Sequence, residues 1–310
     1  MTSNYAVETS QLTRSFGNRD AVRELTLAVA PGEIFGLLGP NGSGKTTTIR
    51  MLLGLIAPSS GEAHVLGCDV KSASQQIRER TGALMEHDGL YERLSARENL
   101  SYFARIYGIG KDAERTRISE LLHGMGLSDR GDEPVSRWSK GMKRKLAMAR
   151  ALVHDPRMVF LDEPTSGLDP LGAKEVRDTI RKMAGESGKT FFLCTHNLNE
   201  AERLCSRVGV LHRGKLIACG GPEEIRADVS CPVIRLGVRG ANGGMRADIG
   251  ALAFVKSVKI SGEEVVVELD DLSRTGEVVR FLAGRGADIY RVEPVQRSLE
   301  EVFLELVGGE

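Results

Sequence analysis

The 310-residue sequence contains no apolar run that approaches the ~18 to 20 residues needed to span a bilayer. Residues 1–10 also lack an apolar signal region, so we expect no secretory leader. Only five cysteines are present, and none forms a Cys-x-x-Cys pair. This pattern favours reduced, mostly buried thiols in a cytosolic protein over a disulfide or metal framework. If the protein works at a membrane, another chain must provide the membrane part.

Neither sign of charge is in excess, because 42 lysines and arginines balance 42 aspartates and glutamates. A net charge of zero argues against a broad nucleic-acid-binding face. No internal repeat or low-complexity segment interrupts the chain, whose length suffices for one large or two medium domains.

The strongest feature that is present is a glycine-rich stretch at residues 39–47. It fits the phosphate-binding pattern of Gly, four residues, Gly, Lys and then Ser or Thr. An apolar run at residues 34–38 precedes it, as a buried parallel strand would, and apolar residues follow it at helical spacing. The stretch therefore joins a strand to a helix, as the pattern requires. The candidate phosphate-binding residues are Gly39, Pro40, Asn41, Gly42, Ser43, Gly44, Lys45, Thr46 and Thr47.

The chemistry of this loop suits a nucleotide phosphate. Glycines allow the backbone to turn several N–H groups toward one point at a helix N-terminus, where the helix dipole favours an anion. Lys45 can add a point charge to the terminal phosphates, and Thr46 can offer a hydroxyl to Mg²⁺. The alternative is a glycine-rich turn with a solvated lysine.

A second apolar run, at residues 158–161, leads directly into Asp162 and Glu163. A buried parallel strand that ends there places both carboxylates at the carboxyl edge of the sheet, where ligands of open α/β sheets bind. The phosphate-binding loop leaves its own strand at the same edge. We therefore predict that Asp162 reaches Mg²⁺ through water and that Glu163 deprotonates a water aimed at the terminal phosphate. An acidic turn that caps the next helix would explain either residue alone, but not both.

Two further candidates lie on neighbouring segments. The apolar run 190–194 ends in Thr195 and His196, which places His196 at the same edge as a donor to a terminal phosphate. A lone histidine is more often structural. Phe16 lies upstream of the loop and is either a stacking platform for an adenine ring or an ordinary core aromatic.

Residues 95–155 are predicted to form a helical insertion, because a capping box at 95–98 opens a helix and a second helix at about 113–125 follows without an intervening strand. Ser139 precedes a third, strongly periodic helix. Its start carries a dense basic cluster, which is either a solvated face or aimed at phosphate. The cluster consists of Lys140, Lys143, Arg144 and Lys145.

The chain changes character near residues 229–231, so we predict two domains, at 1–229 and 230–310. Strands are expected at 233–238, 255–260, 265–269 and 289–292, with a helix at 277–283. A capping box at Ser298 opens a final helix. This second domain is a small α+β domain without a catalytic constellation.

Together these motifs resemble the ATP-binding subunit of ABC transporters, over about residues 5–228. The resemblance implies an α/β fold of the P-loop NTPase class, with an inserted helical subdomain and a small C-terminal α+β domain. It also implies that the protein is an ATPase that uses ATP and Mg²⁺. The matching segments are the Walker A loop at 39–46, Walker B at 158–162, the catalytic glutamate Glu163, the D-loop at 166–169, the switch histidine His196, and two signature positions, Ser139 and Gly141.

The resemblance further implies a mechanism in which two such subunits close head to tail on two ATP molecules. The signature segment 139–141 of one subunit then contacts the γ-phosphate held by the other. Closure and hydrolysis drive a membrane permease, so the expected partners are that permease and a homodimeric or paired ATP-binding subunit, with no nucleic acid. The expected location is the cytoplasm, peripheral on the inner face of the cell membrane.

Two departures from the family pattern bear on function. Lys140 replaces a glycine and Met142 a glutamine in the signature, and Glu86 stands at the Q-loop position. The Ser-Lys-Gly-Met form, Glu86 and the 298–306 stretch look like the branch that serves export permeases for drugs or other small molecules.

Glu86 is a third candidate ligand of Mg²⁺. Since phosphates and two acids would repel its charge, we expect Glu86 to stay away from the site until Mg²⁺ is bound. The alternative is an exposed loop glutamate.

Two other functions compete with transport. A soluble ABC-type ATPase that acts on ribosomes or DNA usually has two ATP-binding halves or a long coiled coil, and neither is found in this sequence. A regulatory subunit that binds ATP without hydrolysing it would not need Glu163.

Overall fold

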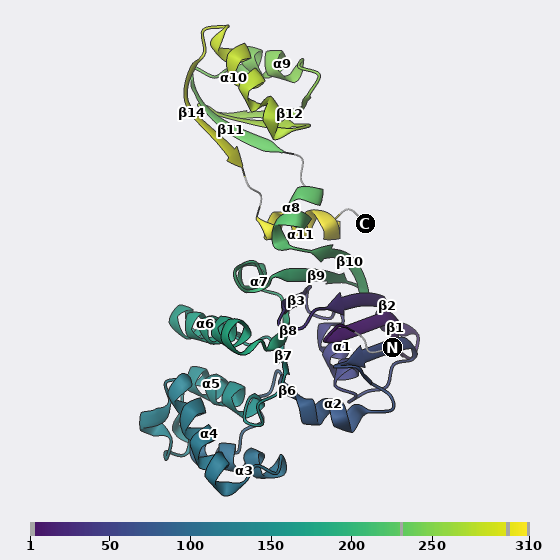
Figure 1. The fold of residues 1–310 in the computed structure, drawn as a ribbon. Coiled ribbons are helices and arrows are strands. Elements are labelled where there is room, and N and C mark those ends of the chain that lie inside the picture. The colour runs from purple at the N-terminus through teal and green to yellow at the C-terminus, as the bar shows by residue number, and fades with distance from the viewer. Residues whose placement is uncertain (1–3, 230–231, 296–297, 309–310) are drawn as a thin grey trace. The chain divides into compact units, whose positions relative to one another are not determined.

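The computed structural model describes residues 4–229, 232–295 and 298–308 (Figure 1). The chain divides into two compact units, Met1–Pro222 and Glu223–Glu310. The division falls at the start of helix α8 (Pro222–Val229). The boundary predicted near 229–231 stays a prediction, and its residues 230–231 lie outside the described residues.

The first unit is built on a six-stranded sheet of order β10-β9-β3-β8-β7-β6. Strands β9, β3, β8, β7 and β6 run parallel, while β10 pairs antiparallel with β9. Every residue of β7 and β8 is buried, as their apolar runs predict. The strands are β3 (Ile34–Leu38), β6 (Thr81–Leu84), β7 (Met158–Asp162), β8 (Thr190–Thr195), β9 (Arg207–His212) and β10 (Lys215–Gly220).

Helices cover both faces of this parallel sheet. Helix α1 (Lys45–Leu52) lies on one face, and α6 (Pro170–Ser187) and α7 (Leu198–Leu204) lie on the other (Figure 1). Helix α1 begins directly at the end of the glycine-rich loop, so the loop and the helix N-terminus meet at the carboxyl edge of β3.

An antiparallel sheet of order β2-β1-β4-β5 packs on the other side of α1. Its strands are β1 (Val7–Phe16), β2 (Arg19–Val29), β4 (Ser60–Val65) and β5 (Cys68–Asp69). Fully buried Leu12, Leu25, Phe35, Ile49 and Met51 form one core from both sheets and α1. This core fixes the helix that starts at the phosphate-binding loop. The sequence analysis did not predict β4, β5 or α2 (Ser74–Arg80).

The predicted insertion lies between β6 and β7 and contains α3 (Ala96–Ile106), α4 (Lys111–Gly124) and α5 (Lys140–Ala151). The capping box at Ser95 is present: its hydroxyl accepts from the Glu98 N–H, and the Glu98 carboxylate accepts from the Ser95 N–H. The three helices pack on one another, and α5 also packs on β6. Helix α5 is thereby held against the parallel sheet.

The second unit has its own core beneath a four-stranded antiparallel sheet of order β12-β13-β11-β14. The element order β-α-β-β-α-β and this strand order form a split βαβ, or ferredoxin-like, arrangement. The predicted strands and the helix near 277–283 are confirmed. Its elements are β11 (Val233–Arg239), α9 (Gly243–Gly250), β12 (Val255–Ser261), β13 (Glu264–Leu269), α10 (Thr275–Ala283) and β14 (Asp288–Val295).

The predicted final helix is α11 (Leu299–Gly308), and the Ser298 hydroxyl accepts from the Glu301 N–H as the capping box requires. Among the residues that the structure describes, we find no helix with the length and apolarity of a membrane span.

Candidate active site

A cavity of about 830 Å³ lies at the carboxyl edge of the parallel sheet. Its volume is within the range of small-molecule sites. Segments that are far apart in the sequence meet there, including the glycine-rich loop, the ends of β6, β7 and β8, and the start of β2. Its lining includes Phe16, Arg19, Asn41, Gly42, Gly44, Lys45, Thr46, Thr47, Glu86, Asp88, Lys140, Arg144, Asp162, Glu163, Ser166 and His196.

Five predicted site residues are not in that lining. Ser43 is buried, and Gly39 and Pro40 direct their carbonyl oxygens to Lys45 Nζ, at 2.8 and 3.1 Å. Ser139 caps α5, with its hydroxyl accepting from the Met142 N–H, and Gly141 lies in the first turn of the same helix.

Close packing explains two glycines of the loop, Gly39 and Gly44. A Cβ on Gly39 would lie 2.2 Å from the Leu211 carbonyl oxygen, and one on Gly44 would lie 2.3 Å from that of Ala21. Gly44 also has a φ of 111°, which side chains rarely allow. The backbone can therefore curl tightly enough to place Lys45 and the first N–H groups of α1 beside the cavity.

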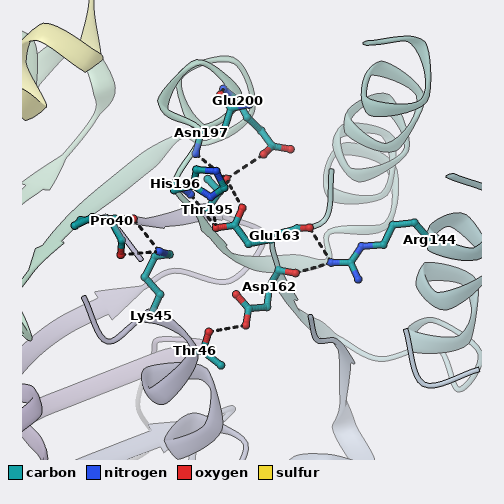
Figure 2. A network of polar contacts seen from close by, with 11 residues as sticks. Pro40, Lys45, Thr46, Arg144, Asp162, Glu163, Thr195, His196, Asn197 and Glu200 are labelled. Carbon is teal, nitrogen blue, oxygen red and sulfur yellow. Dashed lines mark hydrogen bonds and ion pairs between the residues drawn. The ribbon is translucent and has the colours of Figure 1, made fainter. Parts of the chain in front are cut away.

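Asp162 and Thr46 meet across the cavity, where the Thr46 hydroxyl donates to the Asp162 carboxylate at 2.8 Å (Figure 2). Burial is the main cause that raises the pKa of Asp162 above its ordinary value. The hydrogen bond from Thr46 opposes this rise, and the negative charges of Glu163 and Glu86 add to it. A bound cation would therefore stabilise the ionised form of Asp162.

These residues fit a Mg²⁺ ion that is shared with phosphate. Mg²⁺ prefers oxygen ligands and commonly takes one or two carboxylates together with phosphates and water. Thr46 and Asp162 provide such oxygens. Over the described ranges 4–229, 232–295 and 298–308, no cluster of three or more His, Cys, Asp and Glu residues could hold a metal by itself. The phosphates would have to complete the coordination.

Glu163 follows the last residue of β7 in a left-handed conformation, with φ of 51°. Its carboxylate accepts from the backbone N–H of His196 at 3.0 Å, and His196 Nδ1 lies 2.7 Å from the same oxygen (Figure 2). The second carboxylate oxygen accepts from the Thr195 hydroxyl at 3.3 Å. His196 therefore orients the Glu163 carboxylate in this structure. The sequence analysis predicted His196 as a donor to a terminal phosphate and did not predict this contact.

Glu200 is a carboxylate of this network that the sequence analysis treated only as part of a helix cap. That cap is confirmed, since the Asn197 side chain accepts from the Glu200 N–H at 3.1 Å. The Glu200 carboxylate is also buried and lies 3.2 Å from the Thr195 hydroxyl. Burial raises the pKa of Glu200, and hydrogen bonds from Thr165 and Thr195 oppose the rise. Glu163 and Glu200 thus share one hydroxyl.

The basic cluster at the start of α5 does not act as one unit. Lys143 and Lys145 pair with Glu92 and Glu175 on the surface. Lys140 lines the cavity. Arg144 also lines the cavity, but it is buried and its guanidinium donates to the main chain at the end of β7, so a solvated face does not describe it.

The structure bears on the expectations for two single residues, Phe16 and Glu86. Phe16 is 51 % exposed at the cavity margin, with the Arg14 guanidinium 4.6 Å from its ring centroid, so it is not a core aromatic. Glu86 lines the same cavity as Asp162 and Glu163. The hypothesis that Glu86 approaches the metal site only when Mg²⁺ is bound stays a prediction.

Comparison with known proteins identifies the family. Residues 22–166 match the ABC transporter family model, and residues 220–307 match the C-terminal domain of DrrA1-3-like ATP-binding proteins. The chain is 37% identical over 306 residues to the bacitracin transport ATP-binding protein BcrA of Bacillus licheniformis, covering 98% of this chain and 97% of the relative. The chain belongs to the ATP-binding proteins of ABC transporters.

Two further similarities support this family assignment. The Nod factor export ATP-binding protein I of Mesorhizobium japonicum is 39% identical over 311 residues, which cover 99% of this chain and 88% of that protein. The solved structure of cbiO1 from Clostridium perfringens, part of the ABC transporter complex cbiONQ, superposes with a TM-score of 0.67 at 28% identity. That match covers 73% of this chain and 92% of the other.

This ABC ATPase binds and hydrolyses ATP as the subunit that energises a separate permease. The predicted family, the P-loop fold class and the use of ATP are confirmed. The two competing functions, a ribosome- or DNA-directed ATPase and a non-hydrolysing regulator, are not favoured.

Proposed function

We propose that the cavity at the carboxyl edge of the parallel sheet is where this ABC ATPase binds and hydrolyses ATP. The proposal rests mainly on one observation: Lys45, Thr46, Asp162 and Glu163 line a single cavity although more than a hundred residues separate the two pairs. In an α/β sheet such a convergence at the carboxyl edge is typical of a ligand site. Phe16, exposed at the margin, would stack on the adenine ring.

The loop 39–47 would bind the phosphates through its N–H groups and Lys45. In the structure Lys45 Nζ donates to the carbonyl oxygens of Gly39 and Pro40, so its charge is held within the loop that would surround the phosphates. Thr46 and Asp162 would hold Mg²⁺, with Glu86 as a third oxygen donor from the same lining. Bound Mg²⁺ would neutralise negative charge on the phosphate oxygens.

Glu163 would act as the general base that takes a proton from the attacking water. Its carboxylate is held by the main chain and ring of His196 and by the Thr195 hydroxyl, so one orientation is favoured before ATP binds. Preorganisation of this kind places the base without a reorganisation cost during the reaction.

Two subunits would close head to tail, with Ser139 and Gly141 of one subunit at the γ-phosphate of the other. Ser139 caps α5 and lies outside the cavity lining of its own chain, which agrees with a role toward a second subunit. The assembled pair would sit on the cytoplasmic face of a membrane permease. The names of two relatives, bacitracin transport and Nod factor export, support export of a small molecule.

Glu163→Gln tests this proposal. The variant should bind ATP as the native chain does but hydrolyse it roughly 10²- to 10⁴-fold more slowly, the usual contribution of a general acid or base. It should also form an ATP-dependent dimer in gel filtration, because closure is no longer reversed by hydrolysis. Lys45→Ala serves as the contrasting variant and should lose ATP affinity in calorimetry. Native turnover by Glu163→Gln would remove Glu163 from the mechanism.

A further inference from the structure

Arg144 is a buried arginine whose guanidinium reaches the turn that carries Glu163 (Figure 2). Its Nη2 donates to the carbonyl oxygens of Asp162 and Glu163, at 2.6 and 2.7 Å. Its Nε donates to the carbonyl oxygen of Pro164 at 3.2 Å. Three consecutive carbonyls therefore point to one side chain, which is possible only because the backbone turns sharply there.

This turn depends on the unusual conformation of Glu163. A φ of 51° is sparsely populated for a residue with a side chain and persists only where the surroundings enforce it. On one side the Glu163 N–H donates to the Cys194 carbonyl at 2.8 Å, and the carboxylate faces His196. On the other side the carbonyls face Arg144. Without a donor there, buried carbonyl groups would be left without partners, which is unfavourable.

The other end of the guanidinium binds the segment that contains Glu86. Nη1 donates to the Met85 carbonyl oxygen and to the Asp88 carboxylate, each at 2.9 Å. All five N–H donors of Arg144 therefore have acceptors, in the planar fork that only arginine provides. Asp88 also balances the buried charge.

We propose that Arg144 is a positioning residue that sets the orientation of the Glu163 carboxylate and couples it to the segment 85–88. The inference rests on the proposed role of Glu163 as the general base. Arg144 contacts the main chain of Glu163 and not its carboxylate, so it acts through the backbone conformation. A displacement of segment 85–88 is then transmitted to Glu163 through one rigid planar group.

Arg144→Lys tests the positioning role in the full-length chain, because lysine keeps the charge but its single donor atom cannot serve both segments. We expect kcat to fall roughly 10²-fold, as for other small displacements of a catalytic group. The affinity for ATP and KM should stay near native, since Arg144 makes none of its described contacts with the loop 39–47. The matched control is Lys143→Met, which removes a charge from the same helix turn and should leave kcat unchanged.

Asp88→Asn tests the coupling separately, because it removes the carboxylate charge that faces Arg144 and leaves the contacts of Arg144 with residues 162–164 in place. Its kcat should lie between those of the native chain and Arg144→Lys. Circular dichroism shows whether Arg144→Lys folds. If it does not fold, the inference is judged on Asp88→Asn alone. Native kcat in Asp88→Asn would overturn the coupling between segment 85–88 and Glu163.

A double variant separates this inference from the proposed function. If Arg144 acts through Glu163, adding Arg144→Lys to Glu163→Gln should lower kcat no further. Additive losses, native kcat in Arg144→Lys, or an equal loss in Lys143→Met would overturn the positioning role while leaving Glu163 as the base. Native kcat in Glu163→Gln alone would instead overturn the proposed function.

Discussion

Glu86, Asp162 and Glu163 bring three carboxylates to one cavity lining. The charges of Glu163 and Glu86 both raise the pKa of Asp162, so ionising all three together is unfavourable without a cation. Among the described contacts, Asp162 accepts a hydrogen bond from Thr46, and Glu163 accepts from the His196 N–H and the Thr195 hydroxyl. Within this group Glu86 is therefore the residue whose charge most needs an explanation.

Glu86→Gln should preserve Mg²⁺-dependent ATPase activity, because the amide keeps a hard oxygen for the metal and removes the repulsion. Glu86→Ala should lower the activity or uncouple it from the permease, because it removes the oxygen. Steady-state ATPase assays over a range of Mg²⁺ concentrations measure both variants. Glu92→Ala is the control, since Glu92 belongs to the same segment but pairs with Lys143 outside the cavity. Native activity and transport in Glu86→Ala would show that Glu86 is only a loop residue.

Some residues of the site could be predicted from the sequence, and others only from the structure. The placement of Lys45, Thr46, Asp162 and Glu163 was predictable, because the first pair ends the glycine-rich loop after one apolar strand and the second pair ends another apolar strand. Arg144 was not, since in the sequence it is one of four basic residues at the start of a helix. Only the packing of α5 on β6 and the parallel pairing of β6 with β7 bring its guanidinium to the ends of both strands.

Secondary-structure elements with a clear apolar pattern were the ones that the sequence predicted well. The strands of the parallel sheet and the capped helix α3 follow from local residue patterns. Helix α9 was missed because it begins with Gly243 and Gly244, which disfavour helix formation. Its start is stabilised by Asn242, whose side chain accepts from the Met245 N–H, and its Ile249 is buried in the second core. Tertiary packing overrides propensity there.

His154 follows α5 and packs beside the end of α3, in surroundings that favour the neutral form of its ring. The His154 ring stacks on Tyr107 with 3.7 Å between ring centroids, and its Nε2 lies 3.1 Å from the Thr81 carbonyl oxygen. Its Nδ1 is buried without a hydrogen-bond partner. Burial is the main cause that lowers the pKa of His154 from 6.5 to about 4.

This shift predicts acid sensitivity of the first unit. Below pH 6.5 the unfolded chain binds a proton at His154, whereas the folded chain does so only near pH 4. The free energy of unfolding therefore contains the full contribution of neutral His154 above pH 6.5. It decreases as the pH falls toward 4, by on the order of 3 kcal/mol. Urea unfolding at pH 7 and pH 5 should show a smaller pH dependence for His154→Gln than for the native chain.

His123→Gln is the matched control, because His123 is exposed in α4 and its replacement should leave the pH dependence unchanged. Equal pH dependence in His154→Gln and the native chain would mean that the folded chain binds the proton at His154 as readily as the unfolded chain.

At the scale of the whole molecule, the chain combines a catalytic unit with a second unit of unrelated topology. All residues that line the cavity lie between Phe16 and His196, within the first unit. The second unit has a separate core, which includes Ile234, Leu236 and Val265. The sequence predicted a small α+β domain, but not its split βαβ topology. Strand order depends on pairings such as β11 with β13 and β14, which no local pattern specifies.

The last prediction concerns the independence of the two units. A chain truncated after Pro222 should fold and bind ATP with native affinity, because contacts divide at this point and the cavity is complete before it. The boundary predicted from sequence would place the cut near residue 230, which lies outside the described residues. A second variant that ends at Val229 keeps α8 and therefore tests whether that helix matters. Circular dichroism and ATP calorimetry measure folding and affinity.

The outcomes distinguish two roles for residues 223–310. If the truncated chain is folded and binds ATP but Glu163→Gln no longer dimerises within it, the second unit contributes to assembly and not to the nucleotide site. If both variants are soluble and folded but fail to bind ATP, the first unit is not self-sufficient, and the proposed site needs residues beyond Pro222. Recovery of binding only in the chain that ends at Val229 would assign the missing contribution to α8.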